Sequence, residues 1–111
     1  MGYEVLGSSD APYHMKVQYW GGWGYRPRVN MLMSKLDAEL PDHFQFHLSE
    51  DTGITGNFEL FVYDNAGLNG AGTPVYSKKQ SHKFPFDNNN EWGKFTSGLK
   101  QIMKWIWWNH R

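Results

Sequence analysis

Apolar side chains recur along this chain with two different periods. Val17 and Tyr19 alternate with polar neighbours, as do the apolar positions of Phe44–Leu48, and both runs predict short β-strands. Phe58–Tyr63 is rich in aromatic and branched residues, which predicts a central strand. A turn rich in glycine and asparagine comes next, and Pro74–Ser77 then predicts a short strand that completes a hairpin with a long loop.

A helical period governs two further segments. The first opens near Pro27, which suits a first helical turn because its missing N–H has no partner there. Pro41 ends it, because the proline ring pushes the preceding residue out of the helical region. The second comes after Asn88 and Glu91, which have the spacing of a capping box. The apolar positions of the two predicted helices are Val29, Leu32, Met33, Leu36 and Leu40, and Trp92, Phe95, Leu99, Ile102, Met103 and Ile106.

These elements predict one domain over residues 15–108, in the order strand, helix, strand, strand, strand, helix. A strand–helix–strand unit favours parallel pairing, and the hairpin adds antiparallel strands, so we expect a mixed four-stranded sheet. Both helices need an apolar sheet face, which predicts a two-layer α/β sandwich. Residues 1–14 show no clear period and are predicted to be a leader or a tag-like segment.

Composition narrows the function classes. The chain of 111 residues has 11 basic and 11 acidic side chains, and this balance argues against nucleic-acid binding driven by phosphate contacts. The longest apolar run, Trp105–Trp108, is far shorter than the roughly 20 residues that span a bilayer. The amino-terminal residues lack the pattern of a signal peptide. We therefore predict a cytoplasmic protein without a membrane span.

The candidate chemistry is limited by the absence of cysteine, which removes disulfides, thiolate metal sites and a cysteine nucleophile. His43 and His47 are four residues apart and would share one face of a strand, but ordinary histidines fit that spacing better than a metal site. We expect no metal and no bound cofactor.

The most distinctive segment joins the first strand to the first helix. It reads Tyr19-Trp20-Gly21-Gly22-Trp23-Gly24-Tyr25. A strand, a tight loop and a helix start are the layout of a thioredoxin-type redox site, in which a C-x-x-C loop opens the helix. The helix dipole and the free backbone N–H groups stabilise the thiolate there. In this chain, tryptophan stands at both ends of that spacing.

The segment resembles the selenoprotein W family, whose first strand runs into Cys-Gly-x-selenocysteine-Gly-Tyr. Trp20 matches the cysteine and Trp23 matches the selenocysteine, while Gly21, Gly24 and Tyr25 match unchanged. The resemblance covers about residues 15–104, and Asn65–Gly72 looks like a longer hairpin tip than is usual in the family. Its further segments are Lys35-Leu36, Glu39-Leu40-Pro41, Thr55–Leu60 and Val75–Lys79.

The resemblance implies a thioredoxin-like fold without the helix between the second and third strands. It also implies redox activity linked to glutathione or thioredoxin, with an antioxidant or regulatory role and glutathione as the reductant. The chain departs from the family at the two positions that do this chemistry. An indole has one N–H donor and no ionisable nucleophile, so it forms no mixed disulfide. The chain is therefore predicted to be redox-inactive as written.

Three interpretations of Trp20 and Trp23 stay open at this point. Selenocysteine is specified by UGA and cysteine by UGU or UGC, each one base from the tryptophan codon UGG, so the natural gene could encode the redox residues. A second interpretation is a protein-interaction module, in which Tyr19 and Tyr25 join the two indoles at a glycine-rich tip, since aromatic side chains dominate binding hot spots. The third is structural, with the indoles folded onto the domain.

The aromatic end of the chain needs its own explanation. Trp105, Trp107 and Trp108 fall within four residues, so they cannot all face one sheet. At least one is expected to be exposed, to pack on a neighbouring chain or to meet a membrane interface. The sequence leaves the oligomeric state open.

Overall fold

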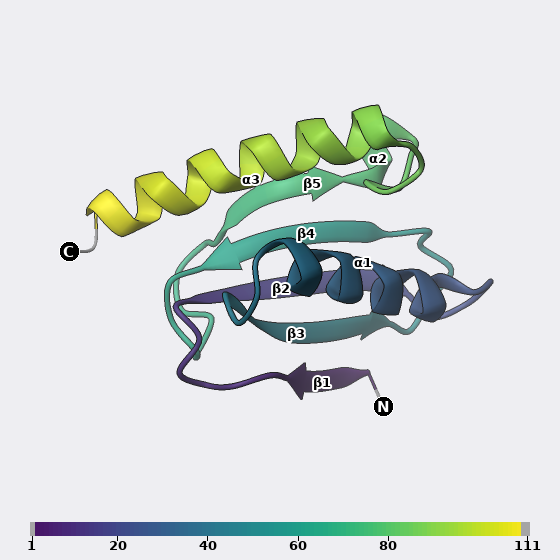
Figure 1. The fold of residues 1–111 in the computed structure, drawn as a ribbon. Helices are drawn as coiled ribbons and strands as arrows, with labels where there is room; N and C mark the ends of the chain where they lie inside the picture. The colour runs from purple at the N-terminus through teal and green to yellow at the C-terminus, as the bar shows by residue number, and fades with distance from the viewer. Residues whose placement is uncertain (1, 110–111) are drawn as a thin grey trace.

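In the computed structural model, which describes residues 2–109, one five-stranded sheet carries the two long helices on one of its faces (Figure 1). The strand order is β1-β3-β2-β4-β5, with β2 parallel to β3 and the other neighbours antiparallel. The elements in chain order are β1 (Tyr3–Leu6), β2 (Tyr13–Trp20), α1 (Tyr25–Glu39), β3 (Phe44–Asp51), β4 (Phe58–Tyr63), β5 (Thr73–Ser77), α2 (Lys78–Ser81) and α3 (Asn89–Asn109). This arrangement confirms the predicted thioredoxin-like two-layer α/β fold.

The strand count differs from the prediction, because the segment predicted as a leader contributes the edge strand β1. Tyr3–Leu6 pairs antiparallel with β3, from Tyr3 opposite Ser49 to Leu6 opposite Phe46. Strand β2 also begins earlier than predicted, at Tyr13. In the structure these residues belong to the sheet; that they are a leader or a tag stays a prediction about their origin.

The helix boundaries reflect local chemistry. Helix α1 begins before Pro27 and ends at Glu39, ahead of Pro41. The Oδ1 of Asn88 accepts a 2.8 Å hydrogen bond from the backbone N–H of Glu91, so the predicted cap opens α3. The short helix α2 lies in a segment for which the sequence predicts neither a helix nor a strand. It forms where the Ser77 side chain caps it and the Glu59 carboxylate accepts the backbone N–H of Lys78 at 3.0 Å.

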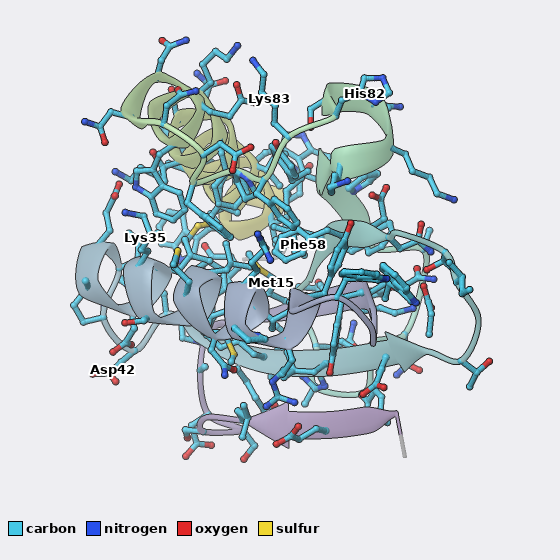
Figure 2. The ribbon with its side chains drawn as sticks, turned by 90° about the vertical axis from the view of Figure 1, so that its right-hand side faces the viewer. Met15, Lys35, Asp42, Phe58, His82 and Lys83 are labelled. Carbon is cyan, nitrogen blue, oxygen red and sulfur yellow. The ribbon has the colours of Figure 1, made fainter. Side chains whose placement is uncertain are left out.

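The core lies between the sheet and the two long helices. Figure 2 shows Met15 and Phe58 in this interior, whereas Lys35, His82 and Lys83 lie at the periphery. The apolar stripes predicted for both helices supply its helical wall. Its fully buried side chains are Met15, Val17, Val29, Leu32, Leu36, Leu48, Phe58, Leu60, Val62 and Leu99.

Within residues 2–109, the other sheet face carries neither of the two long helices but buries two imidazoles. His14 Nδ1 lies 3.1 Å from His47 Nε2, and the Tyr3 hydroxyl lies 3.1 Å from His47 Nδ1. Burial, with a contribution from His14, lowers the pKa of His47. His43 precedes β3, and its Nδ1 lies 2.9 Å from the carbonyl oxygen of Pro41. His43 and His47 therefore do not share a strand face, and residues 2–109 hold no cluster of three metal-ligating side chains.

Candidate functional site

The loop that joins β2 to α1 is built on two left-handed residues. Trp23 has a φ of 51° and Gly24 a φ of 71°, and Gly24 is the residue that precedes the first turn of α1. The backbone N–H of Tyr25 closes the loop on the carbonyl oxygen of Gly22 at 3.2 Å. Both indoles therefore start from the junction between the end of a strand and the amino end of a helix.

Trp20 folds against the domain. Its ring lies 5.4 Å from that of Tyr25, edge to face, and the residue is half-buried. Its backbone N–H donates to the carbonyl oxygen of Asn57 at 3.0 Å. The indole also lies over Gly22, where a Cβ would approach its Cζ2 to 2.7 Å. A side chain at position 22 would displace this ring, so Gly22 allows Trp20 to fold down in this position.

Trp23 points away from the domain, with 83% of its surface exposed. A second apolar side chain, Ile54, is 90% exposed in the connection from β3 to β4. Strands β2 and β3 are parallel and pair Trp20 with Asp51, so both of these loops leave the same end of the sheet. Trp23 and Ile54 therefore present apolar surface at one end of the molecule.

An aromatic floor supports the loop. The ring of Phe84 lies 5.3 Å from Tyr25 and 5.0 Å from Phe58, in edge-to-face contacts with both. Phe86 stacks on Phe84 at 5.7 Å. Phe84, which is about sixty positions from Tyr25 in the sequence, thus packs against the Tyr25 ring and holds it in place. Tyr25 in turn packs against Trp20.

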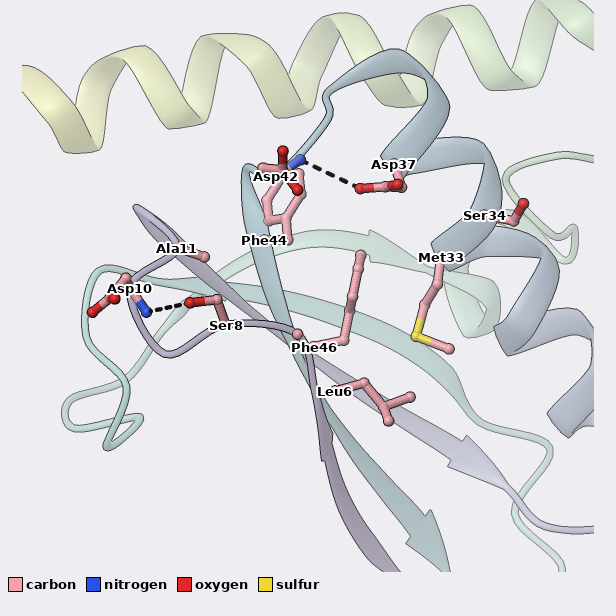
Figure 3. A pocket seen from close by; sticks show the side chains of 11 residues that line it. Leu6, Ser8, Asp10, Ala11, Met33, Ser34, Asp37, Asp42, Phe44 and Phe46 are labelled. Carbon is pink, nitrogen blue, oxygen red and sulfur yellow. Dashed lines mark hydrogen bonds between the residues drawn. The ribbon is translucent and has the colours of Figure 1, made fainter.

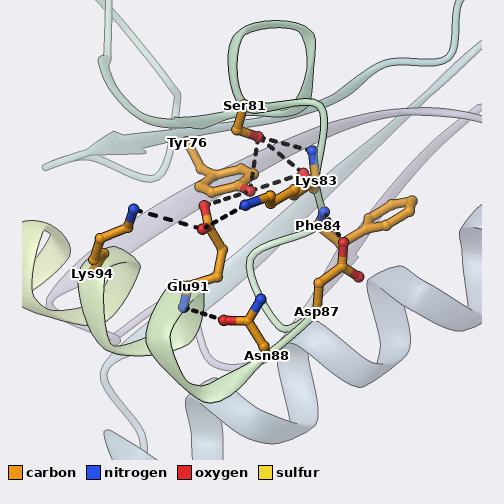
Figure 4. Close-up of polar contacts among 8 residues, drawn as sticks. All are labelled: Tyr76, Ser81, Lys83, Phe84, Asp87, Asn88, Glu91 and Lys94. Carbon is orange, nitrogen blue, oxygen red and sulfur yellow. Dashed lines mark hydrogen bonds and ion pairs between the residues drawn. The ribbon is translucent and has the colours of Figure 1, made fainter.

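A polar network holds the segment that carries Phe84 (Figure 4). The buried Glu91 carboxylate lies 3.9 Å from the Lys83 amine and 3.8 Å from the Lys94 amine. The Tyr76 hydroxyl lies 3.4 Å from Glu91 Oε2 and 2.8 Å from the carbonyl oxygen of Lys83, to which it donates. Burial, with the charge of Glu91, raises the pKa of Tyr76. The network ties β5 and the start of α3 to the floor beneath the loop.

The amino end of α1 favours negative charge. Helix α1 has no acidic side chain in its first turn and no side-chain cap, so no carboxylate compensates its dipole there. Arg28 donates to the carbonyl oxygen of Gly24 at 3.2 Å, and the Lys78 amine lies 5.7 Å from the centre of the Tyr25 ring. These surroundings suit a thiolate or selenolate better than an indole.

The residues on the other side of the loop form a chain of contacts. The Tyr19 hydroxyl donates to Glu50 at 3.5 Å and accepts from Arg26 at 3.4 Å. Arg26 also pairs with Glu4 at 2.8 Å, and this hydrogen bond lowers the pKa of Glu4. Gly21 lies against the Glu50 carboxylate, which would have to move to admit a side chain there. Strand β1 thus reaches the site through Glu4.

Asp51 anchors the foot of the loop. Burial alone would raise its pKa, but hydrogen bonds from Thr55, Gln18 and Asn57 outweigh this effect and lower the pKa. The Nδ2 of Asn57 donates to Asp51 at 2.7 Å. The Oδ1 of Asn57 is the one buried side-chain polar atom within residues 2–109 without a hydrogen-bond partner.

A large hollow of the molecule lies elsewhere. It has a volume of about 540 Å³ and sits between the β1–β2 connection, the second half of α1 and β3 (Figure 3). Leu6, Met33 and Phe46 give it an apolar floor, and Asp37 and Asp42 lie on its rim. None of the loop residues from Tyr19 to Tyr25 lines it.

Sequence similarity to known proteins establishes the family of this chain. Selenoprotein W of Ovis aries is 30% identical over 89 residues, which cover 80% of this chain and 92% of the sheep protein. The chain belongs to the selenoprotein W family. Selenoprotein W of Mus musculus and of Rattus norvegicus is each 28% identical over 89 residues, covering 91% of those proteins. No family model matches the sequence. Membership in the selenoprotein W family places the chain among thioredoxin-like redox proteins.

The seven residues predicted for the site, Tyr19 to Tyr25, span the end of β2, the connecting loop and the first residue of α1. The structure also adds neighbours that sequence reasoning missed, namely Ile54, Phe84 and Asp51. The run Thr55–Leu60 is part of the family resemblance, but nothing in the sequence indicates that its neighbour Ile54 is exposed at the same end as Trp23. Phe84 gives no signal, because it lies between Ser77 and Asn88, where the sequence predicts neither a helix nor a strand.

Proposed function

We propose that the β2–α1 loop is the redox position of a selenoprotein W-type protein linked to glutathione or thioredoxin, and that this chain is redox-inactive as written. The observation that supports this is the place of Trp20 and Trp23 at a strand–helix junction with an uncapped, cation-flanked helix start. The sequence has no cysteine elsewhere to substitute for them. An antioxidant or regulatory role in the cytoplasm is part of the same proposal.

The chemistry would be restored by sulfur at both positions. A thiolate at position 23 would attack hydrogen peroxide, take one oxygen as a sulfenic acid and release water after proton transfer. The thiol at position 20 would displace that oxygen as a second water and form a disulfide. Two molecules of glutathione would then reduce the disulfide and leave as oxidised glutathione. The amino end of α1, with Arg28, would stabilise the thiolate.

The test is a Trp20→Cys/Trp23→Cys variant assayed for peroxide reduction with glutathione, beside the chain as written. We expect turnover in the variant and none in the parent chain. A thiol titration should show one cysteine with a pKa below the ordinary value of about 8.5. Sequencing the natural gene at codons 20 and 23 separately decides whether tryptophan is the native residue.

The chain offers a matched control at the other end of the molecule. Trp105 and Trp108 have the same spacing, but they lie near the carboxyl end of α3, where the dipole disfavours a thiolate. A Trp105→Cys/Trp108→Cys variant should therefore form few thiolates and turn over little peroxide. Equal turnover in both variants would show that two cysteines suffice anywhere and would defeat the proposal.

A second candidate function is a redox-inactive interaction module, favoured by the exposure of Trp23 and Ile54 at one end of the sheet. Each large aromatic side chain can bury roughly 150–250 Å² in a contact. Tyr19, Trp20 and Tyr25 would support the binding tip rather than contact the partner, because they are packed into the domain.

The interaction module is tested with Trp23→Ala and Trp108→Ala in parallel. A partner that is identified by capture on the parent chain should be lost with Trp23→Ala and kept with Trp108→Ala, at unchanged thermal stability. If the parent chain and both variants captured the same partners, the β2–α1 loop would not be the binding surface. Silence of the double-cysteine variant in the peroxide assay, together with loss of a partner, would favour this second candidate.

A further inference from the structure

Charge is distributed unevenly along this neutral chain. From residue 92 to residue 111 the sequence has four basic residues and no acidic one, whereas the preceding residues have seven basic and eleven acidic. The basic residues are Lys94, Lys100, Lys104 and Arg111, of which Arg111 lies outside the described residues. The stretch of sequence that contains most of helix α3 is thus strongly basic.

The same helix ends in exposed aromatic surface. Trp105, Trp107 and Trp108 are 58%, 52% and 62% exposed. Ile106, in the middle of them, is buried and fixes the helix to the domain. Together the three indoles and the exposed amine of Lys104 make up the aromatic end of α3.

The place of the aromatic end in the fold leaves it accessible. In Figure 1 the last turns of α3 extend past the sheet, at the end opposite the β2–α1 loop. The hydroxyl of Tyr13, at the start of β2, donates to the carbonyl oxygen of Met103 at 3.0 Å and anchors the helix one turn before the indoles. The exposed indoles are therefore carried by a regular helix that is fixed to the sheet.

We propose that the aromatic end of α3 binds the surface of an anionic lipid bilayer. Tryptophan prefers the boundary between headgroups and acyl chains, since its ring is apolar and its N–H can stay hydrated. Basic side chains beside it are attracted to anionic headgroups. No helix within residues 2–109 is long and apolar enough to cross a membrane, so this contact is peripheral. It leaves the β2–α1 loop facing the aqueous side.

Two features favour lipid over the other occupants. Lys94 and Lys100 pair with Glu91 and Glu39, but Lys104 makes no ion pair within the described chain and stands among the indoles. The hollow near Asp37 and Asp42 offers acidic, apolar surface to a second copy, but it is a concave site for a few side chains. Three indoles spread over the outward half of a helix end suit a flat, deformable surface instead.

The experiment is flotation of the full chain with vesicles of phosphatidylcholine containing about 30% phosphatidylserine, compared with pure phosphatidylcholine. We expect binding to the anionic vesicles at about 50 mM salt and strong loss at about 500 mM, where charges are screened within a few ångströms. Trp107→Ala/Trp108→Ala should weaken binding at least about tenfold. Lys104→Glu changes two charges, each worth about fivefold at such a surface, and should weaken it roughly thirtyfold.

Trp23→Ala is the matched control, because it removes an even more exposed indole from the opposite end and should leave vesicle binding unchanged. Circular dichroism and the size-exclusion volume of each variant confirm that the fold persists. Absence of binding to anionic vesicles, or equal binding by the parent and the Trp107→Ala/Trp108→Ala variant, would overturn the proposal. A dimer that dissociates only in the Trp107→Ala/Trp108→Ala variant, without vesicle binding, would assign the surface to a second copy and overturn it as well.

Discussion

The two ends of the sheet both expose tryptophan, but they are built in opposite ways. At one end, Trp20 and Trp23 stand before the amino end of α1, within a closed loop that has an aromatic floor. At the other end, Trp105 and Trp108 stand on the carboxyl end of α3, outside the sheet. At the first end one indole packs against the domain and the other is exposed, whereas at the second end all the indoles are exposed. Exposure alone therefore does not define a role; the helix end and the neighbours do.

The largest effect should come from removing the floor on which the loop end depends. Phe58 is fully buried and contacts both Phe84 and Phe86. Phe58→Ala should lower the free energy of unfolding by about 3–5 kcal/mol, because the surrounding rings cannot collapse into the cavity that it leaves. Urea unfolding measures it. Trp108→Ala, the control from the other end, should change the free energy by less than about 0.5 kcal/mol.

The next effect separates the two indoles of the loop. Trp20→Ala removes the edge-to-face contact with Tyr25 and a half-buried ring, which should cost about 2 kcal/mol of unfolding free energy. Trp23→Ala should leave stability within about 0.5 kcal/mol of the parent. Equal losses for the two variants in the same urea titration would mean that Trp23 packs against the domain in solution, and the distinction drawn between them would fail.

Much of this architecture could be predicted from the sequence. Proline at 27 and 41 marked the first helix to within two residues, and the Asn88–Glu91 spacing marked the start of α3. These signals are local, so a single sequence carries them. Strand β1 could not be predicted in this way, because Tyr3–Leu6 is largely exposed and becomes a strand only by pairing with β3, about forty residues away or more.

The candidate site likewise has features that follow from local sequence and features that depend on distant residues. The loop was predicted because glycines, tryptophans and the following helix are consecutive in the sequence. The different fates of Trp20 and Trp23 were not, since they depend on the left-handed backbone of Trp23 and on Phe84, which reaches Tyr25 from a distant part of the chain. The family resemblance identified the positions, and the long-range contacts show how each is held.

Replacing tryptophan by glycine should change the unfolding free energy by a smaller amount, and with opposite signs at the two ends. Trp23 has a φ of 51°, a left-handed conformation that costs a side-chain-bearing residue roughly 1 kcal/mol or more. Trp23→Gly should therefore raise the unfolding free energy by up to about 0.5 kcal/mol, after the extra entropy of glycine in the unfolded chain is subtracted. Trp105→Gly, within regular helix, should lower it by about 0.5 kcal/mol. Thermal unfolding of both variants compares them directly, and the same sign for both would contradict the loop geometry.

The smallest effect concerns pH. The two ends should lose their contributions to the unfolding free energy in different pH ranges. His14 lies near the start of β2, toward the end of the sheet where α3 finishes, and it contacts His47, whose pKa is lowered from the ordinary 6.5 by burial. A lowered pKa means that the unfolded chain binds the proton more tightly, so this contribution is complete above pH 6.5 and is lost as the pH falls below it.

Asp51, at the loop end, also has a lowered pKa, but its ordinary value is 3.8, so its contribution is lost only below that pH. Between about pH 7.5 and pH 5.5 the unfolding free energy should therefore fall because His47 titrates, while the loop end keeps its carboxylate anchor. His47→Gln should flatten this dependence, and Asp51→Asn should leave its slope unchanged while lowering stability across that range. A slope that survives His47→Gln would place the titrating group elsewhere and remove the pH contrast between the two ends.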